Sequence, residues 1–314
     1  MSARVTVYEV GPRDGLQNEA RHVPTAGKLE LLRALARAGL RRIEATSFVS
    51  PRWIPQLADA EEVVAALPGG AEMAYAVLVP NDRGLGRLLE ALARRGPGAP
   101  RVDAAVFLSA SETHNRKNVN KGVDETLAAF EAVVGPARDK GLRVRGYVST
   151  AFGCPYEGRV APDKVAGVAE RLLALGCEQI SLGDTIGVGT PDQVRRLLEI
   201  LLRRAHPEQL ALHMHDTRGT ALANVLAGLE CGLATFDASV GGLGGCPYAP
   251  GASGNLATED LVYMLRGMGY ETGIDWELLV AAGERAQDLV GRPLPGKALQ
   301  AELAGRRRSG SPPQ

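Results

Sequence analysis

Short runs of β-branched and other apolar residues alternate with longer amphipathic segments along most of the chain. We predict eight strands, nearly all followed by a Leu- and Ala-rich segment with helical periodicity. They lie at residues 4–10, 41–47, 72–79, 102–109, 143–150, 179–184, 210–215 and 235–240. Alternation of this kind implies parallel strands joined by right-handed crossovers. Eight units without a break in composition favour an α/β fold of the closed (β/α)8 (TIM) barrel type, with an open doubly wound sheet as the alternative.

The ends of the predicted helices agree with this division. Proline stands just inside two helix starts, at Pro162 and Pro191, and glycine stands where helices should stop, as at Gly39 and Gly176. Residues 274–290 predict one extra helix after the eighth unit, whereas residues 305–314 have the composition of a disordered tail. We therefore expect a single catalytic domain over residues 1–304 with a C-terminal helical extension, followed by that tail.

Composition excludes several classes of function. The chain has 314 residues, and its 36 Lys and Arg balance its 36 Asp and Glu, so no net charge favours nucleic acid or an anionic membrane. No apolar run approaches the roughly 18 residues of a membrane span, and the first residues lack the apolar region of a signal peptide. We expect a cytoplasmic protein. The four cysteines are scattered without a C-x-x-C pair, so neither a disulfide framework nor a thiolate zinc site is indicated.

Several predicted strands end in polar residues, and in a (β/α)8 barrel the carboxyl ends of the strands form the active site. The first strand ends in Glu9 and leads into Gly11-Pro12-Arg13-Asp14-Gly15. This string is a candidate site, although it also suits a type I turn with a solvated Arg13 and Asp14. Three further strand-end groups are either site residues or satisfied polar residues of the barrel core: Glu44, Ser47 and Asp184.

The seventh strand ends in His213-Met214-His215-Asp216. Alternation along a strand places both imidazoles on one face, which is a geometry for two nitrogen ligands to one metal ion. Either histidine taken alone could be a satisfied buried side chain. Because the chain has only five histidines, two on one face at a strand end favour a metal site.

A glycine-rich segment, residues 241–255, follows the eighth strand and contains Cys246 and Asn255. Glycines allow close approach to a ligand and backbone movement, which predicts an active-site loop carrying one thiol. The simpler interpretations are an inert cysteine and an asparagine that caps the next helix.

Taken together, these strings resemble the 3-hydroxy-3-methylglutaryl-CoA (HMG-CoA) lyase family. That family lies in a superfamily of barrel metallolyases that also includes isopropylmalate and homocitrate synthases. The similarity runs through all eight units, and the Gly-Gly-Leu-Gly-Gly-Cys-Pro-Tyr-Ala loop is its most specific part. It rests on five strings: residues 11–19, 43–51, 181–187, 213–216 and 241–255. Ala20 and His114 depart from the family pattern.

The resemblance implies a divalent metal cation held by Asp14, His213, His215 and Asn255. Two nitrogens, a carboxylate and an amide oxygen suit Mg or Mn, and Zn or Co could also bind. The implied substrate is an acyl-CoA, HMG-CoA, cleaved by a retro-Claisen reaction to acetoacetate and acetyl-CoA. Such a reaction belongs to leucine degradation and ketone-body formation. The family often forms dimers, so a homodimer is the candidate assembly.

The resemblance also implies roles for the remaining residues. Arg13 would place a positive charge at the thioester oxygen as it becomes negative, and Cys246 would protonate the acetyl enolate. Asp14 is the nearest candidate proton acceptor, although a metal ligand is a poor free base. The expected orienting residues are Glu9, Glu44 and Asp184, and Ser47 is expected to contact the substrate.

Two alternative functions remain at this point. A Claisen-condensing synthase of the isopropylmalate or homocitrate type would keep the barrel and the metal but run the carbon chemistry in the opposite direction. A catalytically silent metal-binding barrel would bind the cation without turnover. The cysteine loop argues against the synthase, and the silent barrel leaves Arg13 and Cys246 unexplained.

Overall fold

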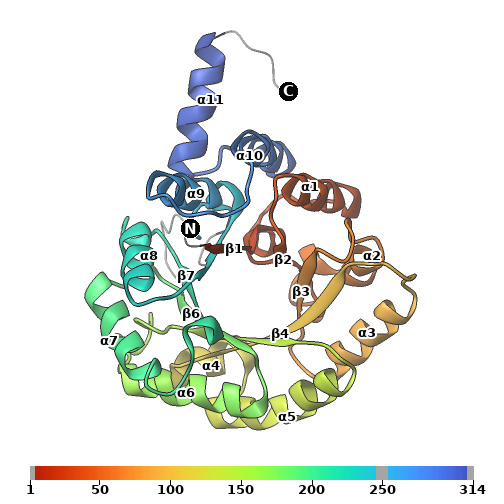
Figure 1. Ribbon diagram of the computed structural model, residues 1–314. Coiled ribbons are helices and arrows are strands. Elements are labelled where there is room, and N and C mark those ends of the chain that lie inside the picture. Colours follow the sequence, from red (N-terminus) through yellow and green to blue (C-terminus); the bar gives the residue numbers. More distant parts are fainter. Residues whose placement is uncertain (1–3, 245–253, 310–314) are drawn as a thin grey trace.

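Eight parallel strands close into a barrel in the computed structural model, which describes residues 4–244 and 254–309 (Figure 1). Each strand pairs with the next in sequence, and β1 closes the ring against β8, from Thr6 opposite Thr235 to Glu9 opposite Ala238. The predicted (β/α)8 barrel is confirmed, and the open sheet is excluded. The strands are β1 (Thr6–Glu9), β2 (Arg42–Ser47), β3 (Ala74–Leu78), β4 (Arg101–Ser109), β5 (Val144–Ser149), β6 (Gln179–Asp184), β7 (Leu210–Met214) and β8 (Thr235–Ala238).

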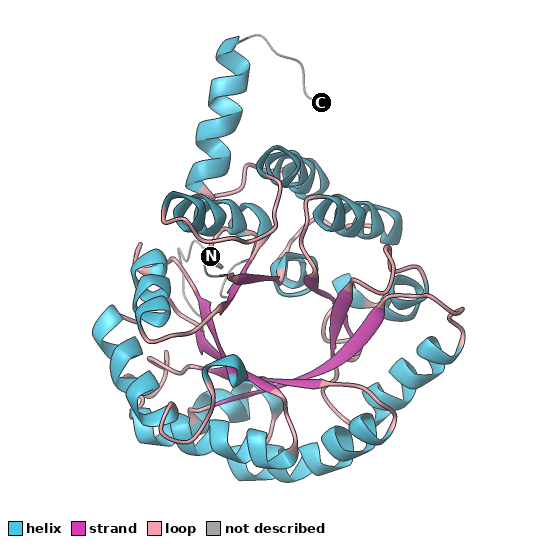
Figure 2. Ribbon diagram, viewed as in Figure 1, coloured by secondary structure: helices cyan, strands magenta, loops and turns pink. Residues whose placement is uncertain are grey.

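The helices form a ring around the outside of the strands (Figure 2). Two of them, α4 and α5, share the connection between β4 and β5. The helices are α1 (Thr25–Arg37), α2 (Ala60–Ala65), α3 (Asp82–Ala93), α4 (Glu112–Val119), α5 (Val123–Asp139), α6 (Pro162–Leu175), α7 (Pro191–Leu201), α8 (Ala221–Glu230), α9 (Thr258–Gly267), α10 (Trp276–Val290) and α11 (Lys297–Ser309). Short helical turns are η1 (Gly11–Gly15), η2 (Leu16–Asn18), η3 (Pro55–Leu57), η4 (Pro207–Gln209) and η5 (Val240–Gly242).

The main apolar core lies between the strands and the helices, where alternate strand residues such as Ile43, Ile180 and Leu212 are buried. The inside of the barrel is different, because a buried ion pair crosses it. Arg145 on β5 makes a bidentate contact with Asp237 on β8, at 2.7 and 3.0 Å. Alternation therefore directs one set of strand residues outward to the helices and the other set into the barrel, where charged side chains lie beside small apolar clusters such as Leu78 and Ala105.

The C-terminal region differs from its prediction. Helix α10 matches the expected extra helix, but α11 was not predicted, and residues 305–309 are helical rather than part of a disordered tail. The start of α11 is held by Asp260, whose carboxylate accepts hydrogen bonds from the backbone N–H groups of Lys297 and Ala298 at 3.1 and 2.6 Å. Leu299 and Leu303 are buried. Figure 1 shows α11 leaving the barrel beside α9 and α10.

None of the described helices is long and apolar enough to cross a membrane.

Glycine is required after α1, where Gly39 has a φ of +100° and a Cβ would overlap the carbonyl oxygen of Gly273. We expect Gly39→Ala to lower the free energy of unfolding by ~3 kcal/mol, since backbone strain and a backbone clash add together. Gly141, which follows α5 with a φ of +77° and open space around its Cβ position, is the matched control. Gly141→Ala should cost ~1 kcal/mol. Denaturant unfolding measures both, and equal losses would contradict the clash.

Candidate functional site

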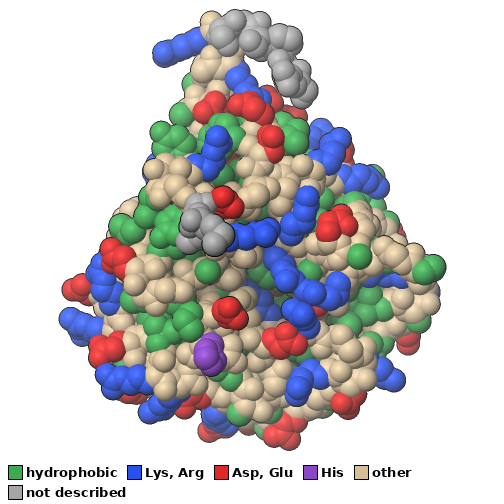
Figure 3. All heavy atoms as spheres, viewed as in Figure 1, with side chains coloured by type: hydrophobic (Ala, Val, Ile, Leu, Met, Phe, Trp, Pro, Cys, Tyr) green, Lys and Arg blue, Asp and Glu red, His purple; other side chains and the backbone are tan. Residues whose placement is uncertain are grey.

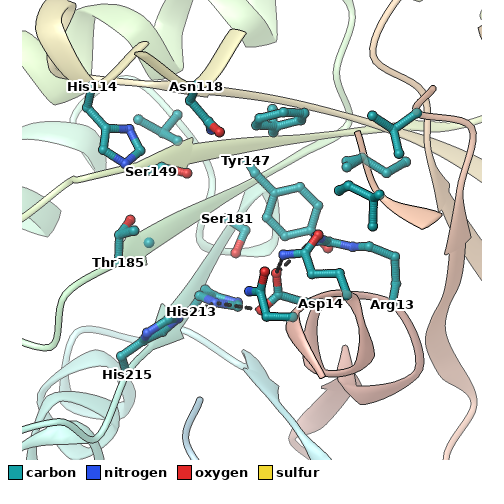
Figure 4. A pocket seen from close by; sticks show the side chains of 18 residues that line it. Arg13, Asp14, His114, Asn118, Tyr147, Ser149, Ser181, Thr185, His213 and His215 are labelled. Atoms are coloured by element: carbon teal, nitrogen blue, oxygen red, sulfur yellow. Dashed lines mark hydrogen bonds and ion pairs between the residues drawn. The ribbon is translucent and has the colours of Figure 1, made fainter. Parts of the chain in front are cut away.

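A cavity of about 270 Å³ opens at the carboxyl ends of the strands (Figure 4). Its polar wall comes from η1 and η2, which follow β1, and from the carboxyl end of β7. Its apolar wall comes from the β2–α2 connection, β3 and β4. The polar wall includes Arg13, Asp14, Gln17, His213 and His215, and the apolar wall includes Val49, Ile54, Leu78 and Phe107. The cavity therefore lies at the carboxyl ends of the strands, where the active site of a (β/α)8 barrel is expected.

Three predicted metal ligands meet at this cavity. Ligand atoms of Asp14, His213 and His215 all lie within 4.8 Å of one another. The Nε2 atoms of the two imidazoles are 3.3 Å apart, and His213 Nε2 lies 3.9 Å from Asp14 Oδ2. Met214, between the histidines, is buried in the apolar core. Two imidazole nitrogens and a carboxylate oxygen turned to one point form a donor set that could hold a metal ion.

Asn255 joins this group from the segment before α9. Its side-chain nitrogen donates to Asp14 Oδ2 at 2.9 Å and to the carbonyl oxygen of Leu243 at 3.1 Å. Its side-chain oxygen is buried without a hydrogen-bond partner among the described residues. A buried acceptor beside a carboxylate and two imidazoles fits the position of a fourth ligand. Asn255 is not a helix cap, because α9 begins at Thr258 and its N-cap is Ala257.

The surrounding charges act differently on the three groups of the triad. Burial lowers the pKa of His213, but Asp237 and Asp14 outweigh it and raise that pKa above its usual value, so a metal ion must displace a proton there. Burial raises the pKa of Asp14, but Arg13 and the two histidines outweigh it and lower that pKa below its usual value. Burial and the neighbouring His213 lower the pKa of His215 to about 4. The Asp14 carboxylate is therefore ionised and the His215 imidazole neutral near neutral pH, which are the forms that bind a cation.

Arg13 and Asp14 stand on a single π-helical turn, η1, and not on a type I turn. The backbone N–H groups of Asp14 and Gly15 both donate to the carbonyl oxygen of Val10, at 2.8 and 3.3 Å. This wide turn directs consecutive side chains into the cavity. π-helical turns are rare and are frequent at functional sites.

Glu9 holds this turn in place through the backbone. Its buried carboxylate accepts from the N–H groups of Gly11 and Val240, at 2.8 and 2.9 Å, and from the Thr258 hydroxyl at 2.7 Å. Burial raises the pKa of Glu9 to about 7, against these hydrogen bonds. Glu9 thus joins η1, η5 and α9, and it orients Arg13 through the main chain rather than by direct contact.

Glu44 contacts Arg13 directly. A nitrogen of the Arg13 guanidinium lies 2.7 Å from Glu44 Oε2, while its other terminal nitrogen donates to Asp14 Oδ1 at 2.9 Å. Arg13 is only 7% exposed. Held between two carboxylates, its planar group keeps one orientation at the cavity wall.

Two predicted site residues have other contacts. The carboxylate of Asp184 accepts from the backbone N–H groups of Val188 and Gly189, at 3.0 and 2.8 Å, so it shapes the loop that follows β6. The Ser47 hydroxyl accepts from the N–H of Val49 at 3.1 Å, and Ser47 is not one of the described residues that line the cavity. Both side chains therefore support loops instead of contacting the triad.

Asp237 contacts the candidate site, although it was not among the residues predicted from the sequence. Its Oδ2 lies 3.3 Å from His213 Nδ1 and accepts from the Ser181 hydroxyl at 2.7 Å, in addition to its ion pair with Arg145. A carboxylate in this position orients the ring of His213, which is a candidate metal ligand. Two charged residues within predicted strands were the available signal, Asp237 in β8 and Arg145 in β5, because a charge is costly to bury unless it is paired.

Cys246 lies outside the described residues. Gly244 and Gly254, the described residues on either side of that segment, are both buried. A Cβ on Gly244 would lie 2.8 Å from the side-chain nitrogen of Asn255, so Gly244 lies directly beside that candidate ligand.

The geometry agrees with comparisons to known proteins. A family model described as HMGL-like matches residues 4–285. The chain belongs to the HMGL-like family. Hydroxymethylglutaryl-CoA lyase of Pseudomonas mevalonii is 50% identical over 303 residues, covering 96% of this chain and 98% of that protein. The crystal structure of the Bacillus subtilis HMG-CoA lyase is 48% identical, covers 96% of this chain and 100% of that one, and gives a TM-score of 0.91.

A third relative was solved with ligands. An HMG-CoA lyase from Acinetobacter baumannii, in complex with coenzyme A and 3-methylmalate, is 42% identical, with coverage of 96% of this chain and 97% of that one and a TM-score of 0.89. The chain spans nearly the full length of all three relatives.

If Asp237 orients His213, then Asp237→Asn should weaken Mn²⁺ binding by ~10- to 100-fold, because the amide is a poorer acceptor for the imidazole N–H. Titration calorimetry with metal-free protein measures the affinity, and circular dichroism checks the fold. Asp103→Asn is the control, since Asp103 also pairs with an arginine but lies on β4 away from the histidines. Equal Mn²⁺ affinities for Asp237→Asn and the unaltered protein would contradict the role.

Proposed function

We propose that this protein is a divalent-metal-dependent carbon–carbon lyase that cleaves HMG-CoA to acetoacetate and acetyl-CoA. The observation that carries the proposal is the position of Arg13, whose guanidinium is paired with Asp14 of the triad and lines the same cavity as both histidines. Its relatives named above are HMG-CoA lyases, one of them in complex with coenzyme A and a hydroxy acid. They support cleavage over the condensing synthase.

Asp14, His213, His215 and Asn255 would hold the cation, and the unpaired Asn255 oxygen is the observation that favours a fourth ligand. The mixture of carboxylate, amide and imidazole donors supports Mg or Mn in our proposal, and Zn or Co would also be accepted. When bound, such a cation supplies a Lewis acid for the oxygens of a hydroxy acid.

Arg13 is assigned to the thioester end of the substrate. Its charge is permanent, and contacts with Glu44 and Asp14 hold its planar group at the wall before substrate arrives. Charge that is already oriented stabilises an enolate oxygen without reorganisation at the moment of cleavage. The apolar wall formed by Val49, Ile54 and Phe107 would exclude water from that oxygen.

The structure favours a ligand role over a base role for Asp14. Its pKa lies below the usual value, and its two oxygens already accept hydrogen bonds from Arg13, Gln17 and Asn255. A carboxylate with a depressed pKa is a weak proton acceptor. In our proposal Asp14 therefore holds the cation and is not assigned as the base for the tertiary alcohol.

Cys246 is proposed as the acid that protonates the acetyl enolate. Gly244 packs against Asn255, and two residues span about 7 Å at full extension. Glu9, Glu44 and Asp237 are proposed as orienting residues. Asp184 and Ser47 are proposed to support the neighbouring loops.

The role in leucine degradation, the cytoplasmic location and the homodimer stay predictions from the sequence and its resemblance.

Incubation of the purified protein with Mg and HMG-CoA should yield acetoacetate and acetyl-CoA in equal amounts. Excess EDTA should abolish the reaction without lowering the melting temperature by more than the loss of bound metal explains, since the main apolar core lies between the strands and the helices and contains none of the triad. His213→Ala combined with His215→Ala should also be inactive. Full activity of metal-free protein or of this double variant would overturn the metal site, and condensation of acetyl-CoA with a 2-oxo acid would favour the synthase.

Arg13→Lys separates charge from geometry. Lysine keeps the charge but loses the planar fork between Glu44 and Asp14, so turnover should fall by ~10²- to 10³-fold while Mn²⁺ affinity stays the same. Arg195→Lys, at an exposed pair with Glu230, is the control and should be fully active. Loss of Mn²⁺ binding in Arg13→Lys would show that Arg13 supports the metal site instead of stabilising the enolate.

Cys246→Ala should reduce turnover by ~10²- to 10⁴-fold, because a general acid acts mainly in the transition state. Substrate and metal binding should stay nearly normal. Cys246→Ser should remain poor, since a hydroxyl is a much weaker acid than a thiol. Cys231→Ala, at a half-buried cysteine on the outer ring, is the matched control. A thiol-directed reagent should inactivate the enzyme at Cys246 with protection by substrate, and labelling of Cys231 with an active Cys246→Ala variant would disprove the assignment.

A further inference from the structure

A second cavity, of about 440 Å³, lies at the end of the barrel where the strands begin, opposite the candidate active site. We call it the arginine hollow. Its charged lining consists of Arg4, Arg41, Arg42, Arg101 and Glu72. Figure 3 views the molecule from this end and shows Lys and Arg side chains gathered near the middle of the face.

The carboxylates around the hollow do not neutralise its arginines. Asp103 makes a bidentate pair with Arg101, at 2.8 and 3.0 Å, and the same carboxylate is the ion-pair partner of Arg42 at 3.8 Å. The single negative charge of Asp103 is therefore shared by Arg101 and Arg42.

Arg41 and Arg4 add to this excess. A terminal nitrogen of Arg41 donates to the carbonyl oxygen of Ala36 at 2.8 Å, which carries no charge, and neither arginine has a carboxylate ion pair among the described residues. The carboxylate of Glu72 accepts from the N–H of Gly70. Four arginines against Asp103 and Glu72 leave two positive charges uncompensated.

The excess positive charge acts on Arg42, which lies close to two other arginines. It is the first residue of β2 and is half-buried. Burial and the nearby charges of Arg101 and Arg143 lower the pKa of Arg42 below its usual value, against the attraction of Asp103. Like charges held together by the barrel repel one another, and an anion placed between them would relieve that repulsion.

We propose that the arginine hollow binds a small multivalent phosphate anion of the pyrophosphate class. Guanidinium groups match pairs of phosphate oxygens with two parallel hydrogen bonds, and two uncompensated charges favour a multivalent anion over a single carboxylate. None of the described residues that line the hollow is aromatic, so nothing there provides a stacking surface for a nucleobase. The phosphate groups themselves are the recognised chemistry.

The bound anion would connect parts of the chain that are distant in sequence. The hollow is lined by the starts of β1, β2 and β4 and by Thr272 and Ile274, which precede α10. An anion held by these elements would stabilise the barrel at the end opposite the cavity that contains Arg13. This inference does not rest on the proposed function, and loss of the site would leave HMG-CoA cleavage intact.

Titration calorimetry with inorganic pyrophosphate tests the site, using the full chain in EDTA so that no cation at the triad recruits the anion. We expect one site per chain and a rise in melting temperature with pyrophosphate concentration. Arg42→Gln and Arg41→Gln should each weaken binding at least about tenfold, since each removes charge-assisted hydrogen bonds. Inorganic phosphate, with less charge, should bind more weakly than pyrophosphate.

Arg203→Gln is the control, because Arg203 is an exposed arginine of the outer ring, paired with Glu199. It should bind pyrophosphate as the unaltered protein does, and circular dichroism and HMG-CoA turnover confirm that the hollow variants are folded. Two results would overturn the proposal: absence of binding to the unaltered protein, or binding that Arg41→Gln and Arg42→Gln leave unchanged while the protein stays folded.

Discussion

The buried ion pair between Arg145 and Asp237 is the interaction on which the inside of this barrel depends. Charges are costly to bury, and removing one partner of such a pair typically costs 3–5 kcal/mol because the other is left uncompensated. Asp237 interacts with two partners, Arg145 and His213. The same carboxylate that balances Arg145 lies 3.3 Å from His213 Nδ1, and its own pKa is lowered to about 2, against the effect of burial, by Arg145 and His213. The centre of the fold and the orientation of a candidate ligand thus depend on one side chain.

A second buried carboxylate, that of Glu9, fixes the position of the main chain around the site. It accepts hydrogen bonds from η1, from η5 and from the start of α9, so the turn that carries Arg13 is fixed to the region that carries Asn255. Glu259 on α9 adds a parallel link, since its carboxylate accepts from the N–H of Gly241 at 2.7 Å. Buried carboxylates that bind main-chain N–H groups hold the first and last units of the barrel in register around the triad.

The two ends of the barrel use arginine differently. At the carboxyl end, Arg13 is closely balanced by Glu44 and Asp14, so its position is defined and its charge is available to a substrate oxygen. At the opposite end, Asp103 pairs closely with Arg101 and only distantly with Arg42, so positive charge remains in excess. Balanced charge favours catalysis by orientation, whereas unbalanced charge favours capture of an anion.

The hydrophobic periodicity of the sequence was enough to predict the barrel and the two histidines of the candidate site. Strand periodicity depends only on neighbouring residues, so the eight strands and the shared face of His213 and His215 were readable from the chain, and the family strings brought in Asp14 and Asn255. The sequence could not show which way a polar strand-end side chain turns. Asp184 and Ser47 turn to their own loops, and Glu9 turns to a backbone more than 200 residues away.

Long-range contacts decided the rest. Asp237 is remote in sequence from Arg145, and their pairing exists only because barrel closure brings β5 and β8 to one interior. Helix α11 extends into a segment with the composition of a tail, because Asp260 caps its start and Leu299 and Leu303 pack on the core. The sequence determined the period of each element and the chemistry each could offer. The tertiary structure decided which charges meet, because the energy of a buried charge depends on partners that sequence distance does not reveal.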